Sequence, residues 1–260
     1  MQPFNIKNGH GFEIVGYVNL IEPIKNIAFI AHGLGGFKEQ RHIQVFAKAF
    51  EESGISTILW DFTNSIGKSG GKMEDASITS YLGDLEEVLN LSKEQSWYRE
   101  PFILCGHSLG GITTAIYAEK HPKKVKGLAP ISTVVSGKLS WDSYTKKELD
   151  DWRKKGSRFE LSKSKPWVIK KLKWSHMEDR LKYDILKNVR QLTMPVLLIV
   201  GSKDKSTPED TQKLLYEALP TKHKELHIIK NAPHSFYNPF HLSEVKKIII
   251  NWINSNGLNN

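Results

Sequence analysis

Short apolar runs alternate with longer stretches of helical period over most of this chain, and this alternation limits the possible folds more than any other feature. The apolar runs predict strands at residues 12–20, 27–31, 55–62, 102–105, 125–132, 196–200 and 226–229. The amphipathic stretches predict helices at residues 41–53, 78–92, 109–121, 208–219 and 241–254, with Thr207 as the cap of the fourth and Pro208 in its first position. Strands joined by helices form a parallel sheet with helices on both faces. We therefore expect an α/β fold with a mostly parallel central sheet, in which the first strand is antiparallel.

The length of the chain, 260 residues, corresponds to one large domain or to one domain with an insertion. Its apolar runs are far shorter than the roughly 20 residues of a spanning helix, so no stable membrane insertion is expected. A secretory signal would show an apolar segment after a basic start, and the N-terminus shows no such segment. Cys105 is the only cysteine, so no intramolecular disulfide can form. These features predict a cytoplasmic protein.

One segment, residues 134–190, differs from the rest in composition. It holds 16 basic and 8 acidic residues and so accounts for +8 of the net charge of +9. Four of the seven tryptophans also lie in it: Trp141, Trp152, Trp167 and Trp174. A shift on this scale marks an insertion, so we divide the chain into a core of residues 1–133 and 191–260 and an inserted cap. Short helices are expected in the cap at residues 148–153 and 167–172.

Two roles are open for this cap. Its tryptophans can form a lid that roofs a substrate pocket and binds the substrate, or the segment can be a structural cap whose lysines are simply solvated. The basic residues alternate with acidic ones and match no nucleic-acid-binding motif. No nucleic-acid partner is therefore expected, although the net charge suggests one.

Two glycine-containing segments resemble nucleotide-binding motifs but fail their spacing rules. The Gly-Leu-Gly at residues 33–35 lacks the third glycine of a dinucleotide fingerprint, because Lys38 occupies that position. The Gly-Lys-Ser at residues 67–69 ends like a phosphate-binding loop, but Phe62 stands where the first glycine is required. No His or Cys pair has a third ligand at the spacing of a zinc site. We expect no cofactor and no metal.

Gly106-His107-Ser108-Leu109-Gly110 is a G-x-S-x-G sequence between an expected strand and an expected helix. This setting is that of a nucleophile elbow, in which a strained turn exposes the serine hydroxyl above the sheet. A side chain at either flanking glycine would collide with the neighbouring strand or helix. The helix that follows also directs free N–H groups toward the serine. We therefore expect Ser108 to be a catalytic nucleophile.

With this motif in this setting, the chain resembles the α/β-hydrolase superfamily, and most of all its small serine esterases, which group with cinnamoyl or feruloyl esterases and monoacylglycerol lipases. The resemblance covers the chain from about residue 10 onward and is loosest across residues 134–190. It implies the α/β-hydrolase fold with a helical cap insertion after the sixth strand. Relatives often carry Asp-x-Arg-Gly-His-Gly-x-Ser after the strand that corresponds to residues 55–62; here Asp61 and Gly67 remain, but the Arg and the His do not.

The resemblance also implies an oxyanion hole, which stabilises the negative charge of the tetrahedral intermediate. In such hydrolases one N–H comes from the loop after the strand that corresponds to residues 27–31, and the second comes from the residue after the nucleophile. By position these residues are Leu34 and Leu109. His32 is expected to brace this loop rather than to titrate.

The fold also places an acid after a late strand and a histidine after the last strand. His234 follows the last expected strand, whereas its rival His241 begins a helical pattern. Asp204 follows the strand at residues 196–200, while Glu209 and Asp210 lie within the next expected helix and are expected to be solvated. Ser108, Asp204 and His234 are thus the expected triad.

These residues predict a serine hydrolase that cleaves carboxylic esters, with aromatic or medium-chain acyl groups, through an acyl-enzyme. A monoacylglycerol lipase, a thioesterase, an acyltransferase and a small peptidase share the same triad and remain alternatives. The non-enzymatic alternative is a ligand-binding protein on a hydrolase scaffold, which usually lacks a triad member. The expected partner is a small-molecule ester, and the sequence leaves open whether the chain forms a homodimer.

Overall fold

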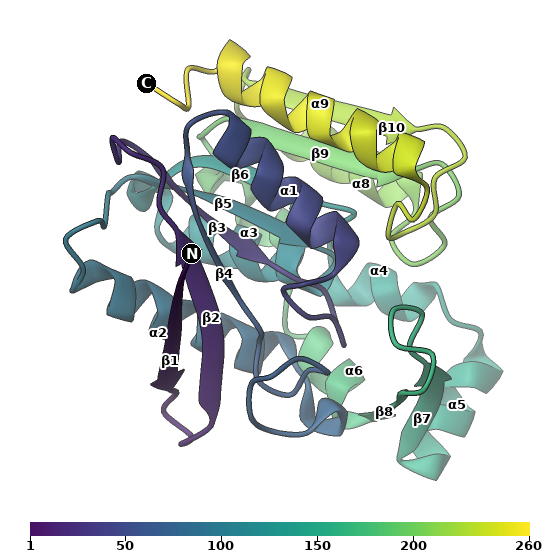
Figure 1. Ribbon diagram of the computed structural model, residues 1–260. Coiled ribbons are helices and arrows are strands. Elements are labelled where there is room, and N and C mark those ends of the chain that lie inside the picture. Colours follow the sequence, from purple (N-terminus) through teal and green to yellow (C-terminus); the bar gives the residue numbers. More distant parts are fainter.

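An eight-stranded sheet runs through the centre of the protein, and the computed structural model describes all 260 residues (Figure 1). The strands of this sheet are β1 (Gln2–Lys7), β2 (Glu13–Asn19), β3 (Ile27–Ala31), β4 (Ser56–Trp60), β5 (Phe102–His107), β6 (Val125–Ile131), β9 (Val196–Gly201) and β10 (Lys224–Ile229). Their order is β1-β2-β4-β3-β5-β6-β9-β10. The pairs β1–β2 and β2–β4 are antiparallel, and every other pair is parallel. The sheet is thus mostly parallel, as expected.

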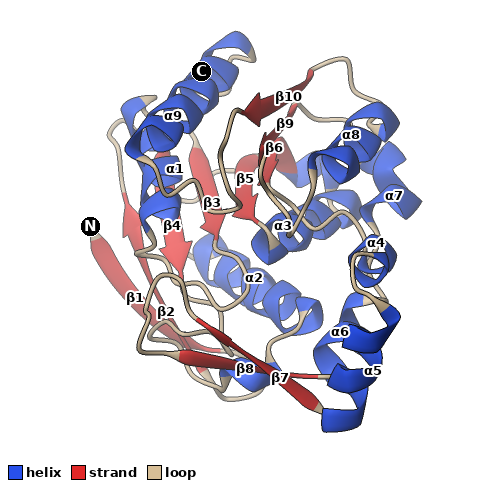
Figure 2. Cartoon of the chain, turned by 90° about the vertical axis from the view of Figure 1, so that its right-hand side faces the viewer, coloured by secondary structure: helices blue, strands red, loops and turns tan.

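Helices cover both faces of the sheet (Figure 2). On one face α1 (Arg41–Glu52) packs beside α9 (Pro239–Ser255), and on the other lie α2 (Ile78–Lys93), α3 (Leu109–Lys120) and α8 (Glu209–Ala218). Short 3₁₀ helices occupy Met73–Asp75, Pro122–Lys124 and Val189–Gln191. None of the helices combines the length and the apolarity that crossing a bilayer requires.

The sheet separates two hydrophobic cores, because successive side chains of a strand point to opposite faces. In β5, Phe102 and Leu104 belong to the core under α2 and α3, whereas Ile103 and Cys105 belong to the core under α1 and α9. A strand buried on both faces has to be apolar at every position. This requirement explains why the central strands are continuous apolar runs in the sequence.

The expected strands and helices of the core all form, and their ends agree with the sequence prediction within two residues. The antiparallel orientation of the first expected strand, β2, is also confirmed. The sequence does not predict β1, an edge strand of which only Phe4 and Ile6 are partly buried. Two apolar residues that alternate with polar ones are too short a pattern to identify such a strand from the sequence.

The inserted segment contains α4 (Gly137–Asp142), α5 (Lys146–Lys155), β7 (Ser157–Leu161), β8 (Ile169–Lys173), α6 (Ser175–Arg180) and α7 (Ile185–Asn188). The helix expected at residues 148–153 forms as α5, which a capping box begins at Thr145 and a left-handed Gly156 ends. The helix expected at residues 167–172 is wrong, because these residues enter β8, which pairs antiparallel with β7. Only Leu172 of this strand is buried, so the segment has no apolar helical face to pack. The cap is therefore a mixture of helices and a β-hairpin.

Candidate active site

Ser108 lies in the sharp turn between β5 and α3, with φ 55° and ψ −114°. A positive φ is strained for a residue with a side chain, and such strain collects at functional sites. A Cβ atom at Gly106 would lie 2.3 Å from the carbonyl oxygen of Gly110, and one at Gly110 would lie 2.4 Å from that of His32. The turn can therefore form only with glycine on both sides, as the sequence predicts for a nucleophile elbow.

The loop after β3 packs directly against this turn. A Cβ atom at Gly33 would lie 3.0 Å from the Cβ atom of Ser108, so the backbone of the loop approaches the serine closely. Leu34 lines the cavity above Ser108. Leu109 is the first residue of α3, where backbone N–H groups have no partner within the helix. Of the two residues expected in the oxyanion hole, Leu34 thus lines the same cavity as Ser108, and Leu109 follows Ser108 directly in the chain.

His32 holds this loop in place, as expected. Its Nε2 accepts the N–H of Phe62 at 3.0 Å, and its Nδ1 donates to the carbonyl oxygen of Gly33 at 2.8 Å. Burial lowers the pKa of His32 below its ordinary value, although the nearby Asp61 acts in the opposite direction.

Asp204 and His234 meet on the loops that follow β9 and β10. Asp204 is buried, and its Oδ2 accepts a hydrogen bond from Nδ1 of His234 at 2.7 Å. Burial alone would raise the pKa of the Asp204 carboxyl, but the hydrogen bonds from His234 and Thr207 outweigh it, and the pKa lies below its ordinary value. The proton on Nδ1 leaves Nε2 of His234 as the unprotonated ring nitrogen.

Thr207 has a different position from the expected one. It does not cap α8, which begins after Pro208 without a side-chain cap. Its hydroxyl instead lies 2.8 Å from Oδ2 of Asp204 and 3.0 Å from the carbonyl oxygen of Ser132, and its N–H donates to Oδ1 of Asp204. A residue three positions after the acid, in an Asp-x-x-Thr pattern, is the sequence signal that could have identified this contact.

His107 makes a second contact that the sequence does not predict. Its Nε2 lies 2.9 Å from the carbonyl oxygen of His234, so the elbow fixes the loop that carries His234. The ring of His42 packs 4.5 Å from that of His107, between centroids. Burial, followed by the nearby His234 and His32, lowers the pKa of His42 to about 3. Burial also lowers the pKa of His107 well below its ordinary value.

Ser108 and His234 line one cavity of about 450 Å³, which core and cap residues enclose together. The ring of His234 makes hydrogen bonds to Asp204 and Thr207, and none joins it to Ser108. Hydrogen bonds of this kind are often long in unliganded enzymes and shorten when the substrate binds. His241, Glu209 and Asp210 do not reach this cavity.

The expected roof of tryptophans over this cavity is not present. None of Trp141, Trp152, Trp167 and Trp174 lines the cavity. Trp152 is buried within the cap, where Trp174 packs on it at 5.5 Å and Trp141 packs on Trp174 at 5.7 Å, between ring centroids. Trp167 is 79% exposed. Three of the tryptophans therefore pack together in the cap, continuous with the core under α2 and α3, and mostly polar side chains of the cap face the cavity.

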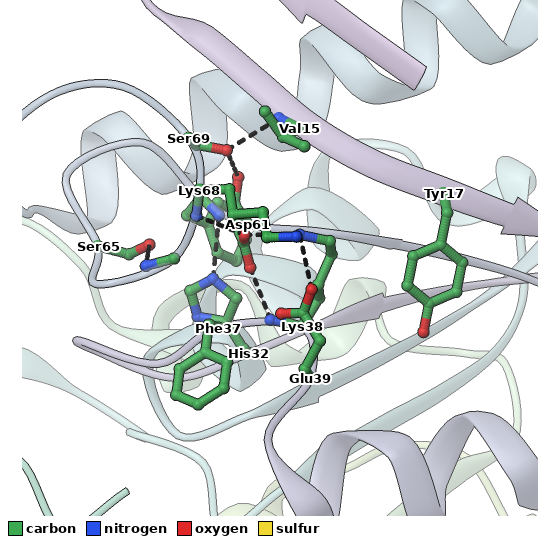
Figure 3. Close-up of polar contacts among 12 residues, drawn as sticks. Val15, Tyr17, His32, Phe37, Lys38, Glu39, Asp61, Ser65, Lys68 and Ser69 are labelled. Carbon is green, nitrogen blue, oxygen red and sulfur yellow. Dashed lines mark hydrogen bonds and ion pairs between the residues drawn. The ribbon is translucent and has the colours of Figure 1, made fainter. Parts of the chain in front are cut away.

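A buried ion pair connects the loop after β3 with the loop after β4 (Figure 3). The Asp61 carboxylate accepts hydrogen bonds from Nζ and the N–H of Lys38, and from the N–H of Lys68, each at 2.7 Å. Burial raises the pKa of Asp61, but His32 and these hydrogen bonds bring it below its ordinary value. A Cβ atom at Gly67 would lie 2.3 Å from Cγ of Asp61, which explains why glycine accompanies the aspartate there.

Comparisons with known proteins agree with this architecture. The chain is 24% identical, over 239 residues, to a 31.7 kDa protein from the traX-finO intergenic region of Escherichia coli, and the match covers 80% of this chain and 82% of that protein. Est1E of Butyrivibrio proteoclasticus, solved with ferulic acid, superposes with a TM-score of 0.83 at 21% identity, covering 98% of this chain and 99% of that one. The monoacylglycerol lipase of Paleococcus ferrophilus gives a TM-score of 0.75 at 23% identity, covering 94% and 99%. These similarities establish the α/β-hydrolase fold.

A comparison of the sequence with models of protein families identifies the family of this chain. Residues 22–239 match the family described as serine aminopeptidase, S33. The match includes the strained Ser108, the buried Asp204 and the His234 that bonds to it. With most of its length in this match, the chain belongs to the serine aminopeptidase S33 family of α/β-hydrolases.

Proposed function

We propose that this protein is a serine hydrolase that cleaves carboxylic esters, with Ser108 as nucleophile, His234 as general base and Asp204 as the acid that orients it. The observation that carries the proposal is the strained turn at Ser108, which opens on the same cavity as the hydrogen-bonded pair of His234 and Asp204. A strained turn at a serine is typical of a nucleophile elbow, because this turn exposes the hydroxyl to the substrate.

The first half of the reaction forms an acyl-enzyme. His234 takes the proton of the Ser108 hydroxyl on Nε2 as the oxygen attacks the ester carbonyl. Asp204 stabilises the imidazolium that results, because its buried carboxylate stays ionised beside Nδ1. His234 then gives the proton to the leaving alcohol. Water repeats the same steps on the acyl-enzyme and releases the acid.

The tetrahedral intermediates place a negative charge on the former carbonyl oxygen. The N–H groups of Leu34 and Leu109 are the proposed donors to it, since Leu34 lines the cavity of Ser108 and Leu109 follows Ser108 at the start of α3. The positive end of α3 adds to this stabilisation. Losing one donor of this kind costs on the order of 3–4 kcal/mol in the transition state.

An ester is proposed rather than a peptide with a free amino terminus because of the charges in the cavity. An aminopeptidase has to bind an ammonium group, which requires free carboxylates or other acceptors. The two carboxylates in the lining are engaged, Glu160 by Lys170 at 2.5 Å and Glu148 by Thr145 at 2.7 Å. Basic side chains outnumber them in the lining: Arg158, Lys163, Lys170, Arg180 and Lys205.

A panel of 4-nitrophenyl esters from acetate to octanoate, with methyl ferulate, tests the proposal. The wild-type protein should hydrolyse at least one of them, and Ser108→Ala should lower kcat by ~10⁴–10⁶ because the nucleophile is lost. Ser175→Ala, at the exposed start of α6, is the matched control and should leave kcat unchanged. A folded Ser108→Ala protein that keeps more than a few per cent of the activity would exclude the mechanism, and no hydrolysis by the wild type would exclude the function.

A further inference from the structure

Two arginines from the cap reach the cavity above Ser108. Arg158 lies on β7 and Arg180 is the last residue of α6, and both line the same cavity as Ser108 and His234. The cap therefore places two guanidinium groups beside the proposed reaction centre, on segments that come from different parts of the insertion.

Neither guanidinium has an acidic partner. Arg158 donates through Nη1 to the hydroxyl of Tyr144 at 2.7 Å and lies 4.2 Å above the ring of Trp152. Arg180 donates through Nη2 to Nε2 of His176 at 2.8 Å. No ion pair includes either arginine. All the partners that the protein supplies to these two cations are thus neutral side chains.

The neutrality of His176 follows from its own contacts. Its Nδ1 donates to the carbonyl oxygen of Ala76 at 2.8 Å, so Nε2 carries the lone pair that accepts from Arg180. Burial, together with the charge of Arg180, lowers the pKa of His176 well below its ordinary value. His176 therefore orients the guanidinium of Arg180 without compensating its charge.

Each guanidinium also retains unused donor capacity. The Nε atoms of Arg158 and Arg180 are buried and make no hydrogen bond. A buried donor without a partner costs about 1–3 kcal/mol, and more when it is charged. Burial and the neighbouring Arg158 lower the pKa of Arg180 to about 10, while Tyr144 and Glu160 act in the opposite direction, so Arg180 stays cationic at neutral pH.

The acids near these arginines are occupied elsewhere. Glu160 pairs with Lys170, Glu148 accepts a hydrogen bond from Thr145, and Asp179 accepts hydrogen bonds from Thr79 and pairs with Lys182. Glu148 and Glu160 still interact with Arg158 electrostatically, but neither makes an ion pair with it. Two guanidiniums without an ion-pair partner at one cavity form a site for an anionic oxygen group, since their planar forks match the paired oxygens of a carboxylate or phosphate.

We propose that Arg158 and Arg180 bind an anionic oxygen group of the substrate, so that the enzyme selects esters that carry a second, negatively charged group over neutral esters of the same shape. This inference rests on the proposed ester hydrolase function. It goes further by assigning a specificity site to the cap. The group belongs to the acyl part or to the alcohol part of the ester, and the experiment below separates these two sources.

The test compares isosteric pairs of esters on the wild-type protein. For the acyl part, the 4-nitrophenyl monoester of adipic acid is compared with that of adipic acid monoamide. For the alcohol part, the butyrate ester of 4-hydroxybenzoate is compared with that of 4-hydroxybenzamide. Within each pair a carboxylate replaces an amide of nearly equal size. One of the two anionic esters should have a kcat/KM about tenfold or more above that of its neutral partner, from two charged hydrogen-bond donors.

Substitutions of the two arginines test whether they cause this preference for the anionic ester. Arg180→Met and Arg158→Met should each bring the ratio of anionic to neutral kcat/KM close to one, and Arg158→Lys should keep part of it because the charge remains. Arg153→Met is the matched control, since Arg153 is an exposed arginine of the same cap and makes no ion pair. It should leave the ratio unchanged.

The outcomes separate this inference from the function on which it rests. Ser108-dependent cleavage with a ratio near one in both pairs would overturn the anion site and leave the ester hydrolase intact. A high ratio that survives both methionine variants would also overturn it, because other side chains would then bind the anion. Cleavage of no ester at all would remove the proposed function, and the inference with it.

Discussion

Asp204 is the proposed acid of the triad, and a neighbour on the next helix provides its control. Asp204→Asn should reduce kcat by up to ~10⁴-fold, because an amide that donates to Nδ1 would hold His234 in the wrong tautomer. Asp210→Asn, at an exposed position of α8, should have nearly wild-type kcat. Steady-state kinetics on the best ester of the panel measures both. Equal losses at the two positions, or a loss at 210 alone, would place the acid elsewhere.

The three residues of the proposed triad are not equally predictable from the sequence. The elbow glycines and their strand and helix flanks predict the turn at Ser108, because the turn excludes any side chain beside it. Asp204 and His234 are expected from chain order and from the ends of two strands. The contacts of Thr207 and His107 could not be predicted, because each joins loops that are distant in the sequence and no periodic pattern indicates such a contact.

At the scale of elements, the predictability of a segment depends on how many of its faces are buried. The central strand β3 agrees with the sequence prediction at both ends, since all five of its residues are buried. The edge strand β1 and the hairpin strand β8 bury few residues, and the sequence predicts neither of them. Burial also could not be read from the composition of the cap. Its tryptophans predict a roof over the substrate pocket, but three of them pack on one another inside the cap.

The buried pair of Lys38 and Asp61 should control how the two loops beside the elbow are held. Lys38→Met should lower the free energy of unfolding by about 3–5 kcal/mol, because it leaves the Asp61 carboxylate buried and unpaired. Lys246→Met removes an exposed ion pair with Glu52 and should change it by less than ~1 kcal/mol. Urea denaturation of both variants measures the difference. Similar small losses would show that the loops are held by other contacts.

At the scale of the whole molecule, two cores on either side of a parallel sheet explain why the α/β class could be predicted from periodicity alone. The position of the cap over the Ser108 cavity could not be predicted, because composition indicates an insertion but does not show which of its side chains face the cavity. The buried histidines are a further property of the assembled molecule: His32, His42, His107 and His176 all have lowered pKa values.

These histidines should make the protein sensitive to mild acid. Below pH ~6.5 the unfolded chain binds protons at these histidines and the folded chain does not, so stability falls by up to ~1.4 kcal/mol per pH unit for each of them. The lowered pKa values of Asp61 and Asp204 add a further loss below pH ~4. Urea denaturation at pH 7.5, 6.0 and 5.0 measures the slope. His42→Leu should reduce it, whereas the surface control His223→Leu should not, and equal slopes in all three proteins would contradict the explanation.

Covalent labelling tests directly whether Ser108 is an activated nucleophile. A fluorophosphonate reacts with a serine that a histidine activates, and peptide mass analysis then locates the adduct. We expect one adduct per chain, on the peptide that contains Ser108, and none in the Ser108→Ala protein. A folded wild-type protein that remains unlabelled, or an adduct on another residue, would contradict the assignment of Ser108 as the nucleophile.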